Sequence, residues 1–157
     1  MSLALLDAQI KDEVMNILTP LCENDDDSNI VVGPKTNSGN LKFNKTFRVI
    51  YEEIETPVTS GENKARTFGG KYNLNIPIRI TIMINSKQIE EAGMKSIQLI
   101  SEVLDDIFLN KRFRKIKGVS DILLDNIITD ASLDLNDPTS IGSGIKLTIK
   151  AMLNHCR

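Results

Sequence analysis

The chain has 157 residues, the length of one domain, and 41% of them are hydrophobic while 25% are charged. This composition is that of an ordinary folded domain with a core, and it excludes a disordered or fibrous chain. The formal net charge of -2 argues against a globally cationic nucleic-acid binder.

Residues 2–21 predict an amphipathic helix. Ser2 is placed to cap its first turn and Pro20 to end it. Apolar residues recur there at every third or fourth position: Leu3, Leu6, Ile10, Val14, Ile17, Leu18 and Leu21. Residues 22–40 combine an acidic cluster with glycine and proline. They are expected to form a long loop around a short apolar segment, Ile30 to Val32.

Two strands are expected next, with a long excursion between them. Residues 41–55 alternate with a period of two, placing Leu41, Phe43, Phe47, Val49 and Tyr51 on one face and Lys42, Asn44, Thr46, Arg48 and Glu52 on the other. Residues 56–73, which exceed any tight hairpin turn, are expected to form an extended excursion. Residues 74–84 alternate without a fault, although Pro77 predicts an edge position or a bulge.

Residues 86–110 predict a second amphipathic helix. Ser86 is its expected N-cap, and Gly93 suggests a close approach to the sheet. The expected apolar stripe is Ile89, Gly93, Ile97, Ile100, Leu104, Ile107 and Phe108. The helix is expected to run into a basic segment, with Gly118 as its stop.

The last third of the chain predicts a second strand pair. Ile122, Leu124 and Ile128 mark a less regular strand, and residues 137–144 are typical of a turn. The final strand alternates through Ile145, Leu147, Ile149, Ala151 and Leu153.

The predicted fold is therefore a single α+β domain, residues 1–157, in the order α-β-β-α-β-β. Two αββ halves would place both helices on one face of a mainly antiparallel sheet. The other face would hold Ile50, Ile54, Met83 and Met152, so it is not expected to be fully solvated. A half-apolar second face is typical of a surface on which a neighbouring subunit packs.

The basic segment from Lys111 to Lys117 is the strongest electrostatic feature, with five cations in seven residues. Phosphate contact and a solvated helix end that complements the helix dipole are both possible interpretations. The second is favoured because Phe113 and Ile116 interrupt the run as core anchors would, and because the whole chain is acidic.

Paired carboxylates occur at Glu52, Glu53 and Glu55 and at Asp105 with Asp106. Adjacent residues on a strand point to opposite faces, so Glu52 and Glu53 could not share a proton in a regular strand. No histidine, serine or lysine has a matching position for acid–base chemistry, and solvated charge is the favoured interpretation.

The cysteines and the single histidine also fail to suggest a site. Cys22 and Cys156 are too few for a disulfide scaffold, and His155 beside Cys156 lacks the spacing of a closed metal site. The sequence thus predicts no catalytic residues, no metal and no cofactor. Neither a signal peptide nor a membrane-spanning stretch is expected.

The order of elements, the chain length and the two loop regions at about 22–40 and 56–73 resemble the tail terminator proteins of long-tailed bacteriophages, the lambda-like family. The resemblance covers the chain from Leu3 to about Leu153. It implies a homo-oligomeric ring, usually hexameric, that caps the tail tube and stops its polymerisation. Such a ring offers a docking surface to head-completion or neck proteins, at the head-proximal end of the virion tail, after assembly in the host cytoplasm.

Within that resemblance the function is expected to lie in surfaces rather than in chemistry. A heterologous contact repeated by rotation closes a ring, and a weakly acidic protein would let DNA pass through the lumen in transit. The residues expected to contact partners or neighbouring subunits are Lys64, Arg66 and Phe68 in the excursion and Arg112, Arg114 and Lys115 in the basic segment.

Three alternatives stay open from the sequence. An enzyme is the least favoured of them, because the single histidine, His155, has no visible acid or nucleophile partner. A neck or tail-completion protein would act one layer away from the terminator. A ferredoxin-like regulatory or ligand-binding domain would need a pocket with convergent polar groups, whereas here the polar residues cluster in loops.

Overall fold

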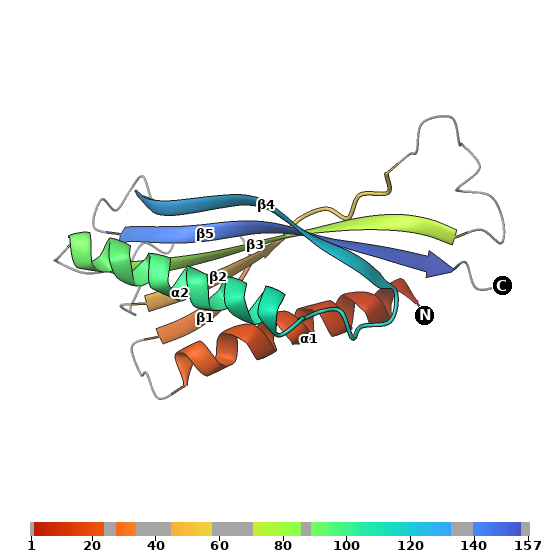
Figure 1. Cartoon of the computed structure of the whole chain (residues 1–157), viewed down its shortest axis with the longest axis horizontal. Coiled ribbons are helices and arrows are strands. Elements are labelled where there is room, and N and C mark those ends of the chain that lie inside the picture. Colours follow the sequence, from red (N-terminus) through yellow and green to blue (C-terminus); the bar gives the residue numbers. More distant parts are fainter. Residues whose placement is uncertain are drawn as a thin grey trace.

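The computed structural model describes residues 2–23, 28–33, 45–57, 71–85, 89–132 and 140–154. These residues form two helices and one five-stranded mixed sheet with the strand order β1-β2-β3-β5-β4. The elements are α1 (Leu3–Cys22), β1 (Ser28–Val32), β2 (Lys45–Tyr51), β3 (Lys71–Asn85), α2 (Ile89–Leu109), β4 (Val119–Ser132) and β5 (Ser140–Asn154). Both helices lie on one face of the sheet (Figure 1), which confirms the predicted α+β class. No helix in the described part of the chain is long and apolar enough to span a bilayer.

The helix α1 forms as its sequence predicts at its start but not at its end. The backbone N–H of Leu5 donates to the Ser2 side chain over 3.2 Å, so Ser2 is the N-cap. The prediction that Pro20 ends the helix is wrong, because α1 continues to Cys22 with Pro20 in its last turn. Proline at this position lacks the N–H that would donate to the Asn16 carbonyl, and its ring crowds that carbonyl, but the helix still continues, since the N–H of Glu23 donates to the Thr19 carbonyl over 3.1 Å.

The strand β1 was not predicted. The observed order is α-β-β-β-α-β-β, so the predicted order α-β-β-α-β-β is wrong. Residues 28–32 pair in parallel with β2, from Ser28 opposite Lys45 to Val32 opposite Val49. Thr46 and Arg48, expected on a polar face, are buried. Thr46 donates its hydroxyl to the Asn29 side chain over 2.8 Å, and Arg48 donates to the carbonyl of Gly33 over 3.3 Å.

The strand β3 is central, between β2 and β5, so the prediction of an edge position or a bulge at Pro77 is wrong for the sheet as a whole. The local environment explains why the proline is tolerated. Regular pairing with β2 ends at Tyr51 opposite Ile78, and the Pro77 carbonyl accepts from Glu52 N. The nitrogen of Pro77 points to the same side of β3 as its carbonyl, toward β2. Because β2 has already ended there, the sheet requires no N–H donor from residue 77.

The strand β5 starts earlier than the sequence predicts, since Ser140 to Gly144 pair with β3 instead of forming a turn. Gly144 makes this pairing possible. A Cβ at this position would lie 2.8 Å from the Thr81 side-chain methyl and 3.3 Å from the Ile80 carbonyl oxygen. The predicted alternation in β5 and β3 is confirmed, because their aliphatic residues from Leu74 to Ile84 and from Ile145 to Leu153 are buried against the helices.

The helix α2 approaches the sheet closely, as Gly93 suggested. Gly93 is buried, and Ser96, one turn later, places its hydroxyl 2.8 Å from the hydroxyl of Ser143 in β5. The buried stripe is rotated relative to the prediction, and it consists of Ala92, Ser96, Ile100, Val103 and Ile107. Ser86, the expected N-cap, lies outside the described residues.

The face of the sheet that carries no helix is only partly apolar, as predicted. Met83 is buried there and Ile50 is half-buried, whereas Met152 is exposed. Arg79 and Lys146 both pair with Glu52 on this face. This surface therefore mixes buried apolar side chains with paired charges.

Candidate interaction surfaces

The basic turn, residues 110–118, leaves α2 through a left-handed residue that is not glycine. The N–H of Arg112 donates to the Ile107 carbonyl over 3.0 Å, and Lys111 has φ 54°. This is the Schellman arrangement that closes a helix C-terminus. The prediction that the helix runs on to Gly118 is wrong, since α2 ends at Leu109.

Phe113 anchors the basic turn in the core. Its side chain is fully buried, and its backbone has φ 69°, a conformation that costs a non-glycine residue about 1 kcal/mol. Burial of a phenyl ring stabilises the fold by about 1.5–3 kcal/mol, so burial outweighs the strain. The sequence-based interpretation of Phe113 as a core anchor is confirmed.

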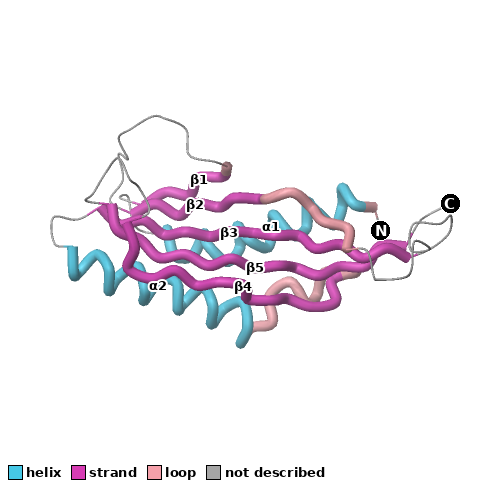
Figure 2. Tube along the Cα trace, turned by 90° about the horizontal axis from the view of Figure 1, so that it is seen from above, coloured by secondary structure: helices cyan, strands magenta, loops and turns pink. Residues whose placement is uncertain are grey.

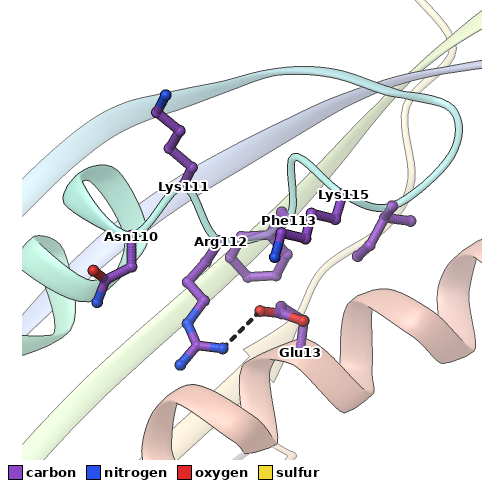
Figure 3. Close-up of a pocket in the computed structure, with 7 residues that line it drawn as sticks. Glu13, Asn110, Lys111, Arg112, Phe113 and Lys115 are labelled. Carbon is purple, nitrogen blue, oxygen red and sulfur yellow. Dashed lines mark hydrogen bonds and ion pairs between the residues drawn. The ribbon is translucent and has the colours of Figure 1, made fainter.

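Arg112 joins the basic turn to both helices. Its guanidinium donates to Asp106 of α2 over 3.1 Å and to Glu13 of α1 over 3.2 Å (Figure 3). The hydrogen bond to Asp106 raises the pKa of Arg112 above its ordinary value, with a smaller contribution from Glu13. Arg112 is therefore a structural clamp as well as a predicted contact residue.

The other cations of the basic turn are exposed. Lys111, Arg114, Lys115 and Lys117 make no ion pair with any other described residue. Lys111 and Arg112 extend to different sides of the turn (Figure 3). A hollow of about 140 Å³ beside them is also lined by the carboxylate of Glu13. These cations do not converge on one point, which disfavours a compact phosphate site.

The strand β4 forms an edge of the described sheet (Figure 2). It exposes apolar side chains on both of its faces. We call Leu123, Leu124, Ile127 and Ile128 the apolar edge; they are 37%, 39%, 44% and 42% exposed. Leu124 lies opposite Leu147 on the helix-covered face, whereas Leu123 lies opposite Thr148 on the other face. Three register shifts interrupt the pairing of β4 with β5.

The apolar edge has only part of the usual protection against strand pairing. Natural edge strands carry charged residues, especially lysine, or proline or bulges, which discourage a second strand from adding to the sheet. The sequence of β4, VSDILLDNIITDAS, contains no lysine and no proline, and its charges are aspartates, while the three register shifts interrupt its ladder. The exposed apolar side chains, rather than the free backbone edge, indicate a contact surface.

The outer flank of α2 extends this surface. Ile97 and Phe108, both expected in the core, are each 36% exposed. They lie on the helix flank opposite Asp106, the residue that faces α1 through Arg112. The flank therefore points away from α1, toward the side of the molecule on which β4 lies (Figure 2).

An acidic groove lies between the last turns of α1 and α2. It has a volume of about 430 Å³, and its apolar lining is Ile17, Pro20, Leu21 and Leu109. Glu102, Asp105, Asp106, Asn110 and Arg112 complete the lining. Leu109 is 74% exposed, an unusual position for a leucine in a helix that packs on a sheet.

The candidate carboxylates that the structure describes are held in separate local contacts. Glu52 is held between Arg79 and Lys146, and the backbone of Glu55 pairs with Asn75. No cluster of three metal-ligating side chains occurs among the described residues. Cys22 is half-buried at the end of α1. His155, Cys156 and the predicted contact residues Lys64, Arg66 and Phe68 lie outside the described residues.

The apolar edge and the acidic groove were not identified from sequence. A signal for the first exists, because the adjacent pairs Leu123–Leu124 and Ile127–Ile128 break the alternation of a half-buried strand. No local signal exists for the groove, which arises where the last turns of two helices far apart in the sequence meet. Leu21 and Asn110, one from each of these turns, carry no pattern by themselves.

Comparison with known proteins identifies a structure with a similar fold but no matching sequence family. No family model and no curated protein matches the chain. The structure is similar to the sheath/tube terminator of an extracellular contractile injection system (PVC) in its extended state, a cryo-EM structure. The TM-score is 0.53 at 17% sequence identity, over 94% of this chain and 56% of that one. The chain thus spans little more than half the length of this structural neighbour, and its fold is similar to that part of the terminator, in agreement with the sequence resemblance.

Proposed function

We propose that this chain is a structural virion protein that caps the tail tube as a ring, stops tube polymerisation and forms the head–tail joining interface. The observation that carries the proposal is a terminator fold whose sheet ends in an exposed apolar edge. On the helix-free face of the described sheet, Arg79 and Lys146 pair with Glu52. The hollow that Arg79 and Lys146 help to line measures about 90 Å³, well below the roughly 300–1,000 Å³ of a typical ligand pocket.

The apolar edge supports ring formation on physical grounds. Burying four side chains that are each about 40% exposed removes apolar surface from water, which favours association. The two edges of the described sheet, β4 and β1, are different, and we propose that β4 contacts a different surface of the neighbouring copy. A heterologous contact of this kind, repeated by rotation, closes a ring, and we propose a hexamer.

The proposed partners are the tail-tube protein on one ring face and a head-completion or neck protein on the other. DNA passes through the lumen in transit, and the net charge of -2 suits a conduit that does not hold it. No membrane and no cofactor take part. The proposed location is the head-proximal end of the tail, and assembly takes place in the host cytoplasm.

The direct test is tube assembly. Purified tube protein is polymerised with increasing amounts of this chain, and tube lengths are measured by negative-stain electron microscopy. Capping predicts shorter tubes that end in a ring, at substoichiometric amounts of the chain. Unchanged tube lengths together with no binding to tube ends would contradict the proposal.

A neck or tail-completion role is distinguished in the same experiment. A neck protein would bind tubes that already carry a terminator and would not shorten bare tubes. The variant Leu124→Lys/Ile127→Lys is expected to lose capping, whereas Met15→Lys, an apolar-to-lysine change at an exposed position on α1, is expected to keep it.

A further inference from the structure

We infer that the acidic groove between α1 and α2 binds residues 64–68 of a second copy of this chain. The inference rests on the proposed ring and adds a specific contact to it. It starts from two features of the groove, an apolar floor with the exposed Leu109 and a row of carboxylates on α2.

The carboxylates of the groove are available for a partner. Asp106 is already paired with Arg112, whereas Glu102 and Asp105 are exposed and make no ion pair with any other described residue. With Arg112 included, the groove carries three acidic side chains and one basic one. An occupant with cations and one large apolar side chain would complement it.

Residues 64–68 have this composition in a matching order. In an extended conformation Lys64, Arg66 and Phe68 fall on the same side of the chain, because successive side chains alternate. About 6.6 Å then separates each of them from the next. On α2 the rise of about 1.5 Å per residue separates Glu102 from Asp105 by about 4.5 Å and from Leu109 by about 10.5 Å.

These spacings allow one alignment. With Lys64 at Glu102 and Arg66 at Asp105, Phe68 reaches Leu109, the exposed apolar side chain that α2 contributes to the groove. A buried aromatic anchor flanked by charge pairs is the usual composition of a protein–protein hot spot. The two predicted sets of contact residues then have different roles: Lys64, Arg66 and Phe68 enter the groove, and Arg112 closes its end.

The geometry favours residues 64–68 of a second copy over those of the same copy as the occupant of the groove. The strand β3 begins at the end of the molecule at which α1 begins (Figure 1), whereas the groove is lined by residues near the end of α1. Pro20 is about 25 Å along the helix from Leu3. Phe68 lies only three residues before Lys71, the first residue of β3, so it stays within about 11 Å of that residue and does not reach the groove of its own copy.

The first test is direct binding. A fluorescent peptide of residues 58–71 is titrated against the Lys64→Glu/Arg66→Glu chain, whose own segments cannot compete, and anisotropy is recorded. Saturable binding is expected, weakened at least about tenfold by Glu102→Gln/Asp105→Asn in the receptor or Phe68→Ala in the peptide. The control Glu90→Gln/Glu91→Gln, at the other end of α2, should bind as the parent does. No saturable binding, or equal affinity for both receptor variants, would overturn the inference.

The second test distinguishes the two sources of the segment. Lys64→Glu/Arg66→Glu and Glu102→Lys/Asp105→Lys are each expected to weaken assembly, and an equimolar mixture of the two is expected to restore it, because each segment then meets a complementary groove on a different copy. If only the chain that combines all four changes recovers, the contact lies within one copy and the inference fails. Assembly that none of these changes affects would refute the groove contact while leaving the proposed function intact.

Discussion

The neighbouring strands β5 and β4 have similar apolar content but opposite surroundings. In β5 the aliphatic residues from Ile145 to Leu153 are buried beneath the two helices, whereas among the described side chains of β4 only Ile122 is buried and the apolar edge is exposed. The two strands are paired along most of their length, so the difference is not one of secondary structure. Apolar residues in a strand favour burial, and under the proposed function a neighbouring copy provides it for the apolar edge.

The largest expected effect compares two leucines that face one another across the ladder. Leu147 in β5 is fully buried and Leu124 in β4 is not. Leu147→Ala should lower the free energy of unfolding by about 3 kcal/mol, because it leaves a cavity, and Leu124→Ala by less than about 1 kcal/mol. Urea denaturation of both variants at low protein concentration measures this. Equal losses would show that β4 belongs to the core of the single copy.

A second test concerns the tight packing of β5. Gly144→Ala should cost about 2 kcal/mol, because the new methyl group overlaps the Thr81 side chain. Adding Thr81→Ser removes the overlapping methyl and should recover part of the loss, since the contact with the Ile80 carbonyl stays. Denaturation of the single and double variants is the measurement, and additive losses would argue against the overlap.

A third test introduces positive charge into the apolar edge of β4. Leu124→Lys/Ile127→Lys should weaken self-association at least about tenfold, equivalent to about 1.4 kcal/mol, because two cations would have to be buried in the contact. The far-ultraviolet circular dichroism of the variant should match that of the parent, and Met15→Lys serves as the control. Sedimentation velocity over a concentration series measures the change. Association that survives in the lysine variant would place the subunit contact elsewhere.

The smallest effect concerns the basic turn that leads from α2 into β4. Arg112→Ala removes the hydrogen bonds to Asp106 and Glu13, and it should lower the free energy of unfolding by about 1 kcal/mol, since the pair is partly solvated. Arg114→Ala, an exposed neighbour, should change it by less than about 0.5 kcal/mol. Thermal unfolding of both variants measures the difference in stability. Equal losses would show that Arg112 does not stabilise the fold through these hydrogen bonds.

Much of the fold follows from local sequence patterns. The alternation in β3 and β5, the N-cap at Ser2 and the anchor at Phe113 were all predictable, because each depends on residues close together in the chain. The strand β1 was not, since a five-residue segment becomes a strand only when β2 lies beside it. The end of α2 was also mispredicted, because a left-handed lysine, and not Gly118, terminates the helix.

The surfaces were less predictable than the fold. Which apolar residues of β4 and α2 remain exposed depends on where the helices lie over the sheet, and a hydrophobic pattern does not contain that information. Ile97 and Phe108 fit the predicted stripe, yet the buried stripe is rotated away from them. The groove requires α1 and α2 to meet at their last turns, a tertiary arrangement that neither helix specifies alone.

The solution mass of the chain tests the central claim most directly. Light scattering over a concentration series should show a closed species near six times 17.5 kDa in the parent chain, and this species should be absent from the Leu124→Lys/Ile127→Lys variant. A stable dimer would contradict the account, because twofold closure would use the surface needed for the ring. So would a parent chain and a lysine variant that are both monomeric at every concentration, with and without tube protein.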